Sequence, residues 1–152
     1  MQEYQGKTVV VTGAGSGLGA AMADVFAAEG ASLALLDIDG ARAEVKAAEL
    51  RERGVDVIAM AVDVANKASL VTAAATVEAR FGCCDVLCAN VGVQQFGAID
   101  KLTDKDWSWV LSVNVMGMVD TVACFLPLLR KVNGDRHIVL TASASYFTPG
   151  VR

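Results

Sequence analysis

The sequence is poor in the residues that build metal sites. It contains one histidine, His137, and four cysteines. Cys83, Cys84 and Cys88 lie close together, but no second pair matches them, and Cys124 stands alone further along the chain. We interpret the cysteines as reduced thiols in or near a core, which is typical of a cytosolic protein. No metal site is therefore expected.

A run of basic residues is also missing, and the net charge is −4. Nucleic acid and anionic membranes attract proteins through clustered Lys and Arg, so neither is an expected partner. The first residues, MQEYQGKTVVV, contain no basic segment followed by a long apolar one, so no secretory signal is expected. The most membrane-like stretch, 110–129, is interrupted by Asn114, Asp120 and Pro127, which argues against a transmembrane span. We expect a cytoplasmic protein.

Apolar residues are abundant. They make up 54% of the 152 residues, which is more than in an average globular chain. The length is that of one domain. The apolar excess must be buried in a fully covered sheet, in a subunit interface or against chain that this sequence does not contain.

Short β-branched runs alternate with longer amphipathic runs along the chain. The expected strands are residues 7–12, 32–37, 56–61, 85–89 and 136–141. The expected helices are residues 17–29, 40–53, 67–81 and 103–131. Nearly continuous apolar strands between helices indicate an α/β fold, a parallel sheet with helices on both faces, and right-handed crossovers make it doubly wound and Rossmann-like. Its ligand site lies beyond the carboxyl ends of the strands, where the strand order reverses.

A glycine-rich segment, TGAGSGLG at residues 12–19, joins the first expected strand to the first helix. Gly13 permits a tight turn, Gly17 lets backbone amides approach a diphosphate, and Gly19 lets the helix pack close to the strand. A glycine-rich loop alone could be an ordinary turn, but this one opens a strand–helix–strand unit, which indicates nucleotide binding. The candidate cofactor-binding residues here are Gly13, Ser16, Gly17, Leu18 and Gly19.

Asp37 ends the second expected strand, 18 positions after Gly19. A carboxylate at this place can accept hydrogen bonds from the hydroxyls of an adenine ribose, and it would repel a 2′-phosphate. Its neighbours Ile38 and Asp39 offer no arginine for such a phosphate, and neither does Ser16. The residues favour NAD over NADP. Asp37 could instead cap the next helix, although Asp39 is the better cap candidate.

The spacing Thr-Gly-x-x-x-Gly-x-Gly of residues 12–19 resembles that of the short-chain dehydrogenase/reductase family, and the resemblance extends over nearly the whole chain. It implies an NAD(P)-dependent oxidoreductase. It also implies further cofactor contacts after the third and fourth strands, at Asp63, Val64, Asn90 and Gly92, with Val91 in place of the family's alanine. From the residues alone, Asp63 could cap the helix at Lys67 and Asn90 could hold a turn.

The resemblance also implies catalytic roles. Asn114 in the segment VNVMG matches the family's catalytic asparagine, whose helix is locally distorted and frees a carbonyl for a proton-relay water. A buried, hydrogen-bonding asparagine is the alternative. Ser143 after the fifth strand matches the catalytic serine. Thr141 and Ser145 compete for this role, but counting from Ile138 in the family pattern selects Ser143.

The family's acid/base tyrosine stands in a Tyr-x-x-x-Lys motif, which this chain does not contain. Tyr146 is followed by Gly150 instead of lysine and lies too close to Ser143, so we interpret it as a pocket or packing residue. The resemblance implies that the motif follows Arg152. We therefore expect residues 1–152 to be an incomplete domain, truncated after the fifth strand and inactive alone.

In the intact enzyme, the resemblance implies hydride transfer between nicotinamide and a secondary alcohol or ketone, a small-molecule substrate. Gln94, Gln95 and Phe96 are expected to line one side of its pocket. A homo-oligomer, dimer or tetramer, is expected, because apolar residues cover more than one face of the helix from Asp106 to Lys131, which family members commonly pair with its copy. Two alternatives stay open: a catalytically inactive nucleotide-binding fragment, and a methyltransferase, against which the ordered family matches argue.

Three further residues invite functional interpretations. Trp107 and Trp109, at the start of the long helix, are expected to pack rather than to bind a ligand. His137 begins the fifth strand, away from the carboxyl-end site. A packed or surface histidine is therefore expected there, not a catalytic one.

Overall fold

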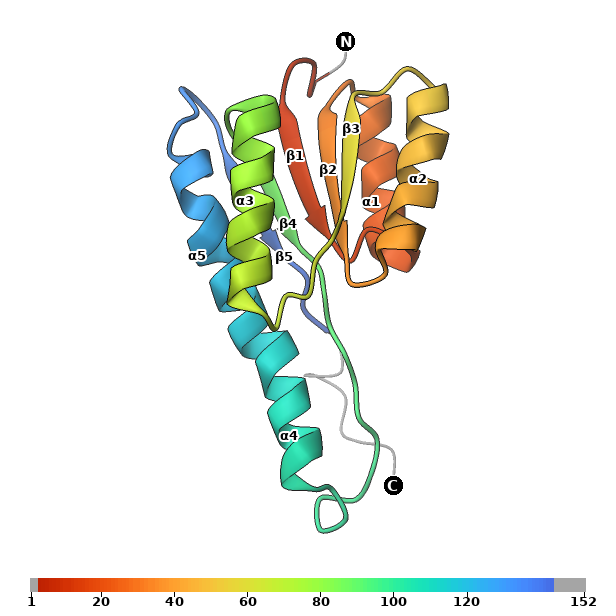
Figure 1. The fold of residues 1–152 in the computed structure, drawn as a ribbon, viewed down its shortest axis with the longest axis vertical. Helices are drawn as coiled ribbons and strands as arrows, with labels where there is room; N and C mark the ends of the chain where they lie inside the picture. The colour runs from red at the N-terminus through yellow and green to blue at the C-terminus, as the bar shows by residue number, and fades with distance from the viewer. Residues whose placement is uncertain (1–2, 144–152) are drawn as a thin grey trace.

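The structure, a computed structural model, describes residues 3–143. Its parallel strands form one sheet in the order β3-β2-β1-β4-β5 (Figure 1). The strands are β1 (Thr8–Thr12), β2 (Ser32–Asp37), β3 (Val57–Ala61), β4 (Val86–Ala89) and β5 (His137–Leu140). The chain builds outward from β1 to β3 and then crosses to the other side of β1 for β4. The sheet is doubly wound, as predicted, and the strand order reverses between β1 and β4.

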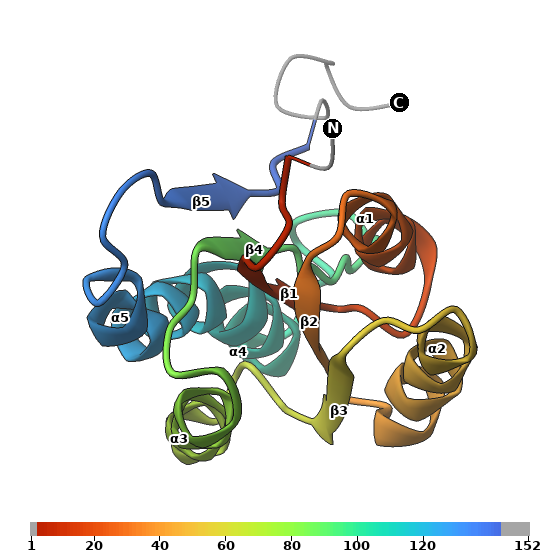
Figure 2. The same cartoon turned by 90° about the horizontal axis from the view of Figure 1, so that it is seen from above.

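Helices cover both faces of the sheet (Figure 2). They are α1 (Gly17–Ala28), α2 (Gly40–Glu52), α3 (Lys67–Phe81), α4 (Asp104–Leu111) and α5 (Met118–Leu129). One buried cluster joins α1 and α2 to the sheet through small residues such as Ala23 and Ala47. The other joins α3 and α5 to the opposite face through Leu70, Val77 and Phe125. Because β1 lies between both layers, all of its residues are buried.

The long helix expected over residues 103–131 is present, but it is not uniform. A capping box between Thr103 and Asp106 starts α4. A π-helical turn, η1 (Ser112–Gly117), then separates α4 from α5. π-Helical turns within α-helices are frequent at functional sites. The local distortion implied by the family resemblance around Asn114 is therefore confirmed.

The continuous helix over residues 104–129 is long and apolar enough to span a membrane, judged by length and composition alone. Helices that pack in a globular core meet the same criterion. Here Phe125, Leu128 and Leu129 are buried in the cluster shared with the sheet and α3. This helix is therefore weak evidence for a membrane span.

Within the described residues, β5 pairs only with β4 and forms an edge of the sheet. Its apolar residues Ile138, Val139 and Leu140 keep 41%, 39% and 51% of their surface exposed. No described helix lies over this end of the sheet on the side of α1 (Figure 2). The outer edge of β5 is thus unpaired within the described residues, and the strand is largely uncovered.

The cysteines are free thiols, as expected. Cys84 and Cys88 are buried, and Cys83 and Cys124 are partly buried. Burial raises the pKa of Cys84 to about 12 and that of Cys88 to about 11. These thiols therefore stay protonated in the folded chain near neutral pH.

Candidate active site

A cleft of about 550 Å³ lies at the carboxyl ends of the strands, over the point where the strand order reverses. All but one of the predicted cofactor residues line it, the exception being Gly19. They are Gly13, Ser16, Gly17, Leu18, Asp37, Asp63, Val64, Asn90 and Gly92. The residues come from loops after β1, β2, β3 and β4, far apart in sequence. The fold thus brings the predicted set together on one surface.

The glycine-rich loop has the geometry that the sequence predicted. Gly13 and Gly17 adopt left-handed φ angles of 67° and 52°, which side chains disfavour. A Cβ on Gly19 would lie 2.1 Å from the carbonyl oxygen of Gly13, so only glycine allows α1 to pack this close to the loop. A Cβ on Gly17, by contrast, would meet no atom within 4 Å, so the backbone at this position is open to the cleft.

Asp37 is held in place on both carboxylate oxygens. Oδ2 accepts a hydrogen bond of 2.8 Å from the backbone N–H of Gly15, and Oδ1 accepts one of 2.9 Å from that of Asp39. Asp39 caps α2 by accepting from the N–H of Arg42. Asp37 is therefore not the helix cap, and the alternative interpretation of this residue is wrong.

Gly15 and Arg42 also shape this site, although the sequence did not single them out. A Cβ on Gly15 would lie 3.0 Å from Asp37 Oδ2 and 2.9 Å from Arg42 Cβ, so a side chain there would displace the carboxylate. The glycine pattern itself was the signal for Gly15. Arg42 lies in the first turn of α2, and its Nε pairs with Asp39 Oδ2 at 3.2 Å. No arginine stands beside Asp37 in the sequence, but the structure places Arg42 near the end of β2, where it forms an ion pair with Asp39.

Asp63 follows β3, and its Oδ1 accepts a 2.9 Å hydrogen bond from the N–H of Ala65. The cap of α3 is Asn66, whose side chain accepts from the N–H of Ala68. The interpretation of Asp63 as a helix cap is therefore wrong. Asp63 instead shapes its own loop at the wall of the cleft.

Asn90 joins the ends of several strands. Its N–H donates to Thr12 Oγ1 at 2.9 Å, and its Oδ1 accepts from Thr141 Oγ1 at 2.8 Å. Thr12 Oγ1 in turn donates to the carbonyl of Cys88. Asn90 thus links the ends of β1 and β5 to the loop after β4. Thr141, a competitor for the serine role, uses its hydroxyl in this network.

A second cleft of about 430 Å³ adjoins the first and shares Asn90–Val93 with it. It is lined by the predicted catalytic residues Asn114 and Ser143, and by Gln94. Gln95 lines a smaller hollow of about 180 Å³ beside it. Phe96 is 80% exposed and lines neither, against expectation. The candidate catalytic and cofactor residues therefore lie in adjoining clefts.

Asn114 lies in η1 and connects the helix to the loop after β4. Its Oδ1 accepts from the N–H of Val93, and its Nδ2 donates to the carbonyl of Val93, both at 2.8 Å. The hydrogen-bonding alternative and the distorted helix therefore apply to the same residue. This side chain fixes the wall between the two clefts.

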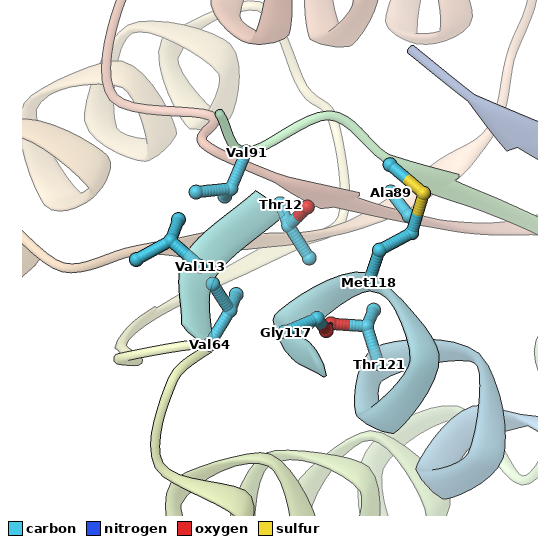
Figure 3. Close-up of a pocket in the computed structure, with 8 residues that line it drawn as sticks. All are labelled: Thr12, Val64, Ala89, Val91, Val113, Gly117, Met118 and Thr121. Atoms are coloured by element: carbon cyan, nitrogen blue, oxygen red, sulfur yellow. Dashed lines mark hydrogen bonds between the residues drawn. The ribbon is translucent and has the colours of Figure 1, made fainter. Parts of the chain in front are cut away.

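Beneath the first cleft, the helix meets the sheet closely (Figure 3). Val64, Val91 and Val113 meet around a small gap of about 10 Å³, room for one water molecule at most. A Cβ on Gly117 would lie 2.9 Å from Val64 Cγ2. Glycine at this position lets η1 approach the loop after β3, which brings Val113 to the cleft.

The two tryptophans do not pack as expected. Trp107 and Trp109 keep 44% and 45% of their surface exposed. Trp109 lines the first cleft together with Val113, whereas Trp107 lines the hollow beside Gln95. His137 lies at the start of β5, the end of the strand opposite the clefts, as predicted.

Known proteins resemble this chain in both sequence and structure. A family model described as short chain dehydrogenase matches residues 7–151. The chain belongs to this family. A C alpha-dehydrogenase from Sphingobium sp. strain SYK-6 is 32% identical over 148 residues, which are 97% of this chain and 48% of that protein.

Solved structures of short-chain dehydrogenases share the fold. One from Burkholderia phymatum, in complex with NAD, has a TM-score of 0.93 and 37% identity, covering 99% of this chain and 53% of that one. An alcohol dehydrogenase from Thermococcus sibiricus, complexed with 5-hydroxy-NADP, has a TM-score of 0.79 and 35% identity. The match covers 82% of this chain and 54% of that one. The chain spans about half the length of the curated relatives it matches, 48% and 56% for two of them. Ser145, Tyr146 and Gly150 lie outside the described residues.

Proposed function

We propose that this short-chain dehydrogenase chain belongs to an NAD-dependent enzyme that transfers hydride between nicotinamide and a secondary alcohol or ketone. The observation that carries the proposal is the adjoining pair of clefts, one lined by the cofactor candidates and the other by Asn114 and Ser143. Their shared wall, Asn90–Val93, is fixed to the sheet by Asn90 and to the helix by Asn114. The nicotinamide ring of a cofactor in the first cleft would therefore face the reacting carbon of a substrate in the second.

The residues of the first cleft fit a dinucleotide. The open space over Gly17 leaves backbone N–H groups accessible at the start of α1, where a diphosphate is favoured. Ser16 is the N-cap of α1, but its side chain makes no capping hydrogen bond, so its hydroxyl can serve a ligand. Gly13, Gly17, Asp37 and Asp63 would hold the cofactor, which supplies the hydride chemistry when bound.

The choice of NAD follows from Asp37. Both of its oxygens are fixed by backbone amides, so the carboxylate cannot turn away from a 2′-phosphate without breaking them. Like charges placed together cost several kcal/mol in a partly desolvated site. Arg42 could offset part of this charge, because its solvent-exposed pair with Asp39 is weak. One solved relative is a complex with NAD and another is a complex with 5-hydroxy-NADP, so the relatives do not favour either cofactor. The proposal of NAD therefore depends on Asp37.

The chain's own residues prepare the substrate. Ser143 would hydrogen-bond the substrate oxygen and hold it in position. A carbonyl of η1 near Asn114 would hold a relay water. Among residues 3–143, no histidine, lysine or tyrosine lines the second cleft, and His137 lies at the far end of β5. A group outside the described part of the chain would exchange the proton, and the Tyr-x-x-x-Lys motif that the family resemblance implies would supply it.

The test is to assay the full-length gene product with NAD⁺ against a panel of secondary alcohols, and with NADH against the corresponding ketones. We expect turnover that falls sharply when Ser143 is replaced by alanine. Loss of one positioned hydrogen-bond donor to the reacting oxygen typically costs about 10²- to 10³-fold in rate. The proposal would be contradicted if the protein converted none of these compounds, or if S143A were as active as the wild type.

We further propose that the enzyme is a cytoplasmic homo-oligomer, a dimer or tetramer. Four apolar side chains of the long helix, Leu111, Val115, Met116 and Val119, are 48–54% exposed. A second copy of this helix would cover them, as the family resemblance suggests. Sedimentation of the full-length protein at micromolar concentration should show an oligomer, and a monomer would contradict this part.

A further inference from the structure

Trp109 has a large apolar ring that the fold leaves 45% exposed. It lines the same cleft as Asp37 and Asp63, on the opposite, helical wall. Large exposed aromatic side chains in a cleft are commonly ligand contacts, because the ring offers a wide apolar surface that water solvates poorly. An occupant of the cleft would cover the ring.

The position of the ring in the cleft identifies the part of the ligand that it meets. Trp109 lies one helical turn before Val113, so both side chains point from the same face of the helix into the cleft. Helical side chains lean toward the helix N-terminus, which places the ring further out than Val113. Across the cleft lie Asp63 and Val64 from the loop after β3. The ring and this loop thus form two walls of a slot beside Asp37.

The same geometry separates Trp109 from the apolar surface proposed to meet a second copy. Leu111 is two positions further along the helix, about 200° around its axis. Leu111 is exposed and does not line the cleft. Trp107 is also on another side and lines the hollow next to Gln95. Trp109 is therefore set apart from its neighbours by facing the nucleotide cleft.

We propose that the indole ring of Trp109 forms the outer wall of the adenine subsite and stacks on or against the purine ring of the cofactor. This inference rests on the proposed function, since it assumes a dinucleotide in the cleft. Asp37 marks the ribose end of the slot, and the purine is the flat, apolar part of the ligand next to it. A planar aromatic wall matches the flat face of a purine and can stack on it.

The test measures binding of NADH and of ADP-ribose, which lacks the nicotinamide, to the full-length protein by calorimetry. Stacking of a base on an aromatic side chain is worth about 5- to 150-fold in affinity. W109A should weaken both ligands by the same factor within this range, whereas W109F should bind nearly as tightly as the wild type. The KM for NAD⁺ should rise in W109A by a similar factor.

Trp107 provides the matched control, because W107A removes an equally exposed indole two positions away. It should leave the binding of both ligands unchanged. Indole fluorescence provides a second measurement that uses phenylalanine variants instead of alanine variants. ADP-ribose should quench the emission of W107F, which keeps Trp109, more strongly than the emission of W109F, which keeps Trp107. This comparison applies even if W109A fails to fold.

Equal affinity of W109A and the wild type for ADP-ribose would overturn the inference, and so would equal quenching in W107F and W109F. A wild-type protein that binds neither NADH nor ADP-ribose would contradict the proposed function itself. If only the role of Trp109 is wrong, the wild type binds both ligands and W109A binds them equally well, so the two outcomes can be told apart.

Discussion

Asp37 contributes to the structure of the loop and to the proposed choice of cofactor at once. Its carboxylate accepts from the N–H of Gly15 and therefore ties the glycine-rich loop to the end of β2. The absence of a side chain on Gly15 makes this approach possible. A ribose hydroxyl would bind a carboxylate whose direction is already fixed, which reduces the entropy lost on binding.

Replacing Asp37 with alanine and Ile38 with arginine should shift the preference of the full-length enzyme from NAD toward NADP. The change removes a negative charge that opposes the 2′-phosphate and adds a positive charge at an exposed site, where Ile38 is now 74% exposed. We expect the ratio of kcat/KM for the two cofactors to change by at least about 100-fold, since each factor of ten needs only about 1.4 kcal/mol. The single variant I38R, which keeps Asp37, is the control. An unchanged ratio in the double variant would contradict the role of Asp37.

The buried thiols should make the free energy of unfolding depend on pH in the alkaline range. In the unfolded chain a cysteine has a pKa of about 8.5, whereas burial raises the pKa of Cys88 to about 11 in the fold. The stability that comes from this difference is complete below the unfolded pKa and is lost as the pH rises through the folded pKa. The free energy of unfolding should therefore fall by about 1.4 kcal/mol per pH unit for each such thiol above pH 8.5.

Urea unfolding of the full-length protein between pH 8 and pH 10.5 measures this loss. C88A should be less stable throughout, because the side chain is in the core, but its stability should fall less steeply with pH. C124A provides a comparison at a less buried thiol. Identical slopes for the wild type and C88A would rule out this account of the thiol.

At the scale of elements, the fold was predictable because the strands are apolar runs and the helices carry clear end signals. The expected elements are all present, with ends shifted by at most two residues. The glycines that end α1, α2 and α3, such as Gly82 with its φ of 82°, account for this accuracy. Propensity does not reveal which carbonyl or amide a side chain reaches, so the pairing of Asn114 with Val93 could not be predicted.

The same limit explains the errors at single residues. Asp63 and Asn66 both precede α3, and either could cap it, so only the backbone geometry shows that Asn66 does. Trp109 has the pattern of a core residue, because the apolar periodicity does not reveal that the helix passes beside an open cleft. Arg42 is four residues beyond Ile38 in sequence, but the first turn of α2 returns it to the loop.

Replacing Asn114 with alanine should disconnect the loop after β4 from the long helix. Both hydrogen bonds to Val93 are lost, which should cost about 1–2 kcal/mol of stability in a partly buried site. Because this loop forms the wall between the clefts, kcat/KM of the full-length enzyme should fall by at least about tenfold. S112A is the control, because it removes a hydrogen bond to the carbonyl of Trp109 in the same helix and leaves the loop alone. Wild-type kcat/KM in N114A would exclude the positioning role.

At the scale of the whole molecule, the described residues leave one edge of the sheet open beside the second cleft. The outer edge of β5 is unpaired, and its apolar residues are exposed beside the second cleft. Exposed, unpaired strands favour association with other chains. A polypeptide of residues 1–152 should therefore be poorly soluble.

That polypeptide should also be inactive when purified under native conditions. Ser143 can orient a substrate oxygen, but no described histidine, lysine or tyrosine lines its cleft to exchange the proton. Assaying NAD⁺ reduction with secondary alcohols, beside the full-length protein, measures the loss, which should exceed about 10²-fold. Comparable turnover by the two polypeptides would show that residues 1–152 carry their own acid–base group.

The measurement that tests the central claim most directly is the titration of the full-length protein with NADH and with NADPH at the same ionic strength. It needs no knowledge of the substrate and addresses the cleft that the predicted residues form. The carboxylate of Asp37 should make NADH bind at least about tenfold more tightly than NADPH. Tighter binding of NADPH, or no binding of either, would contradict the account.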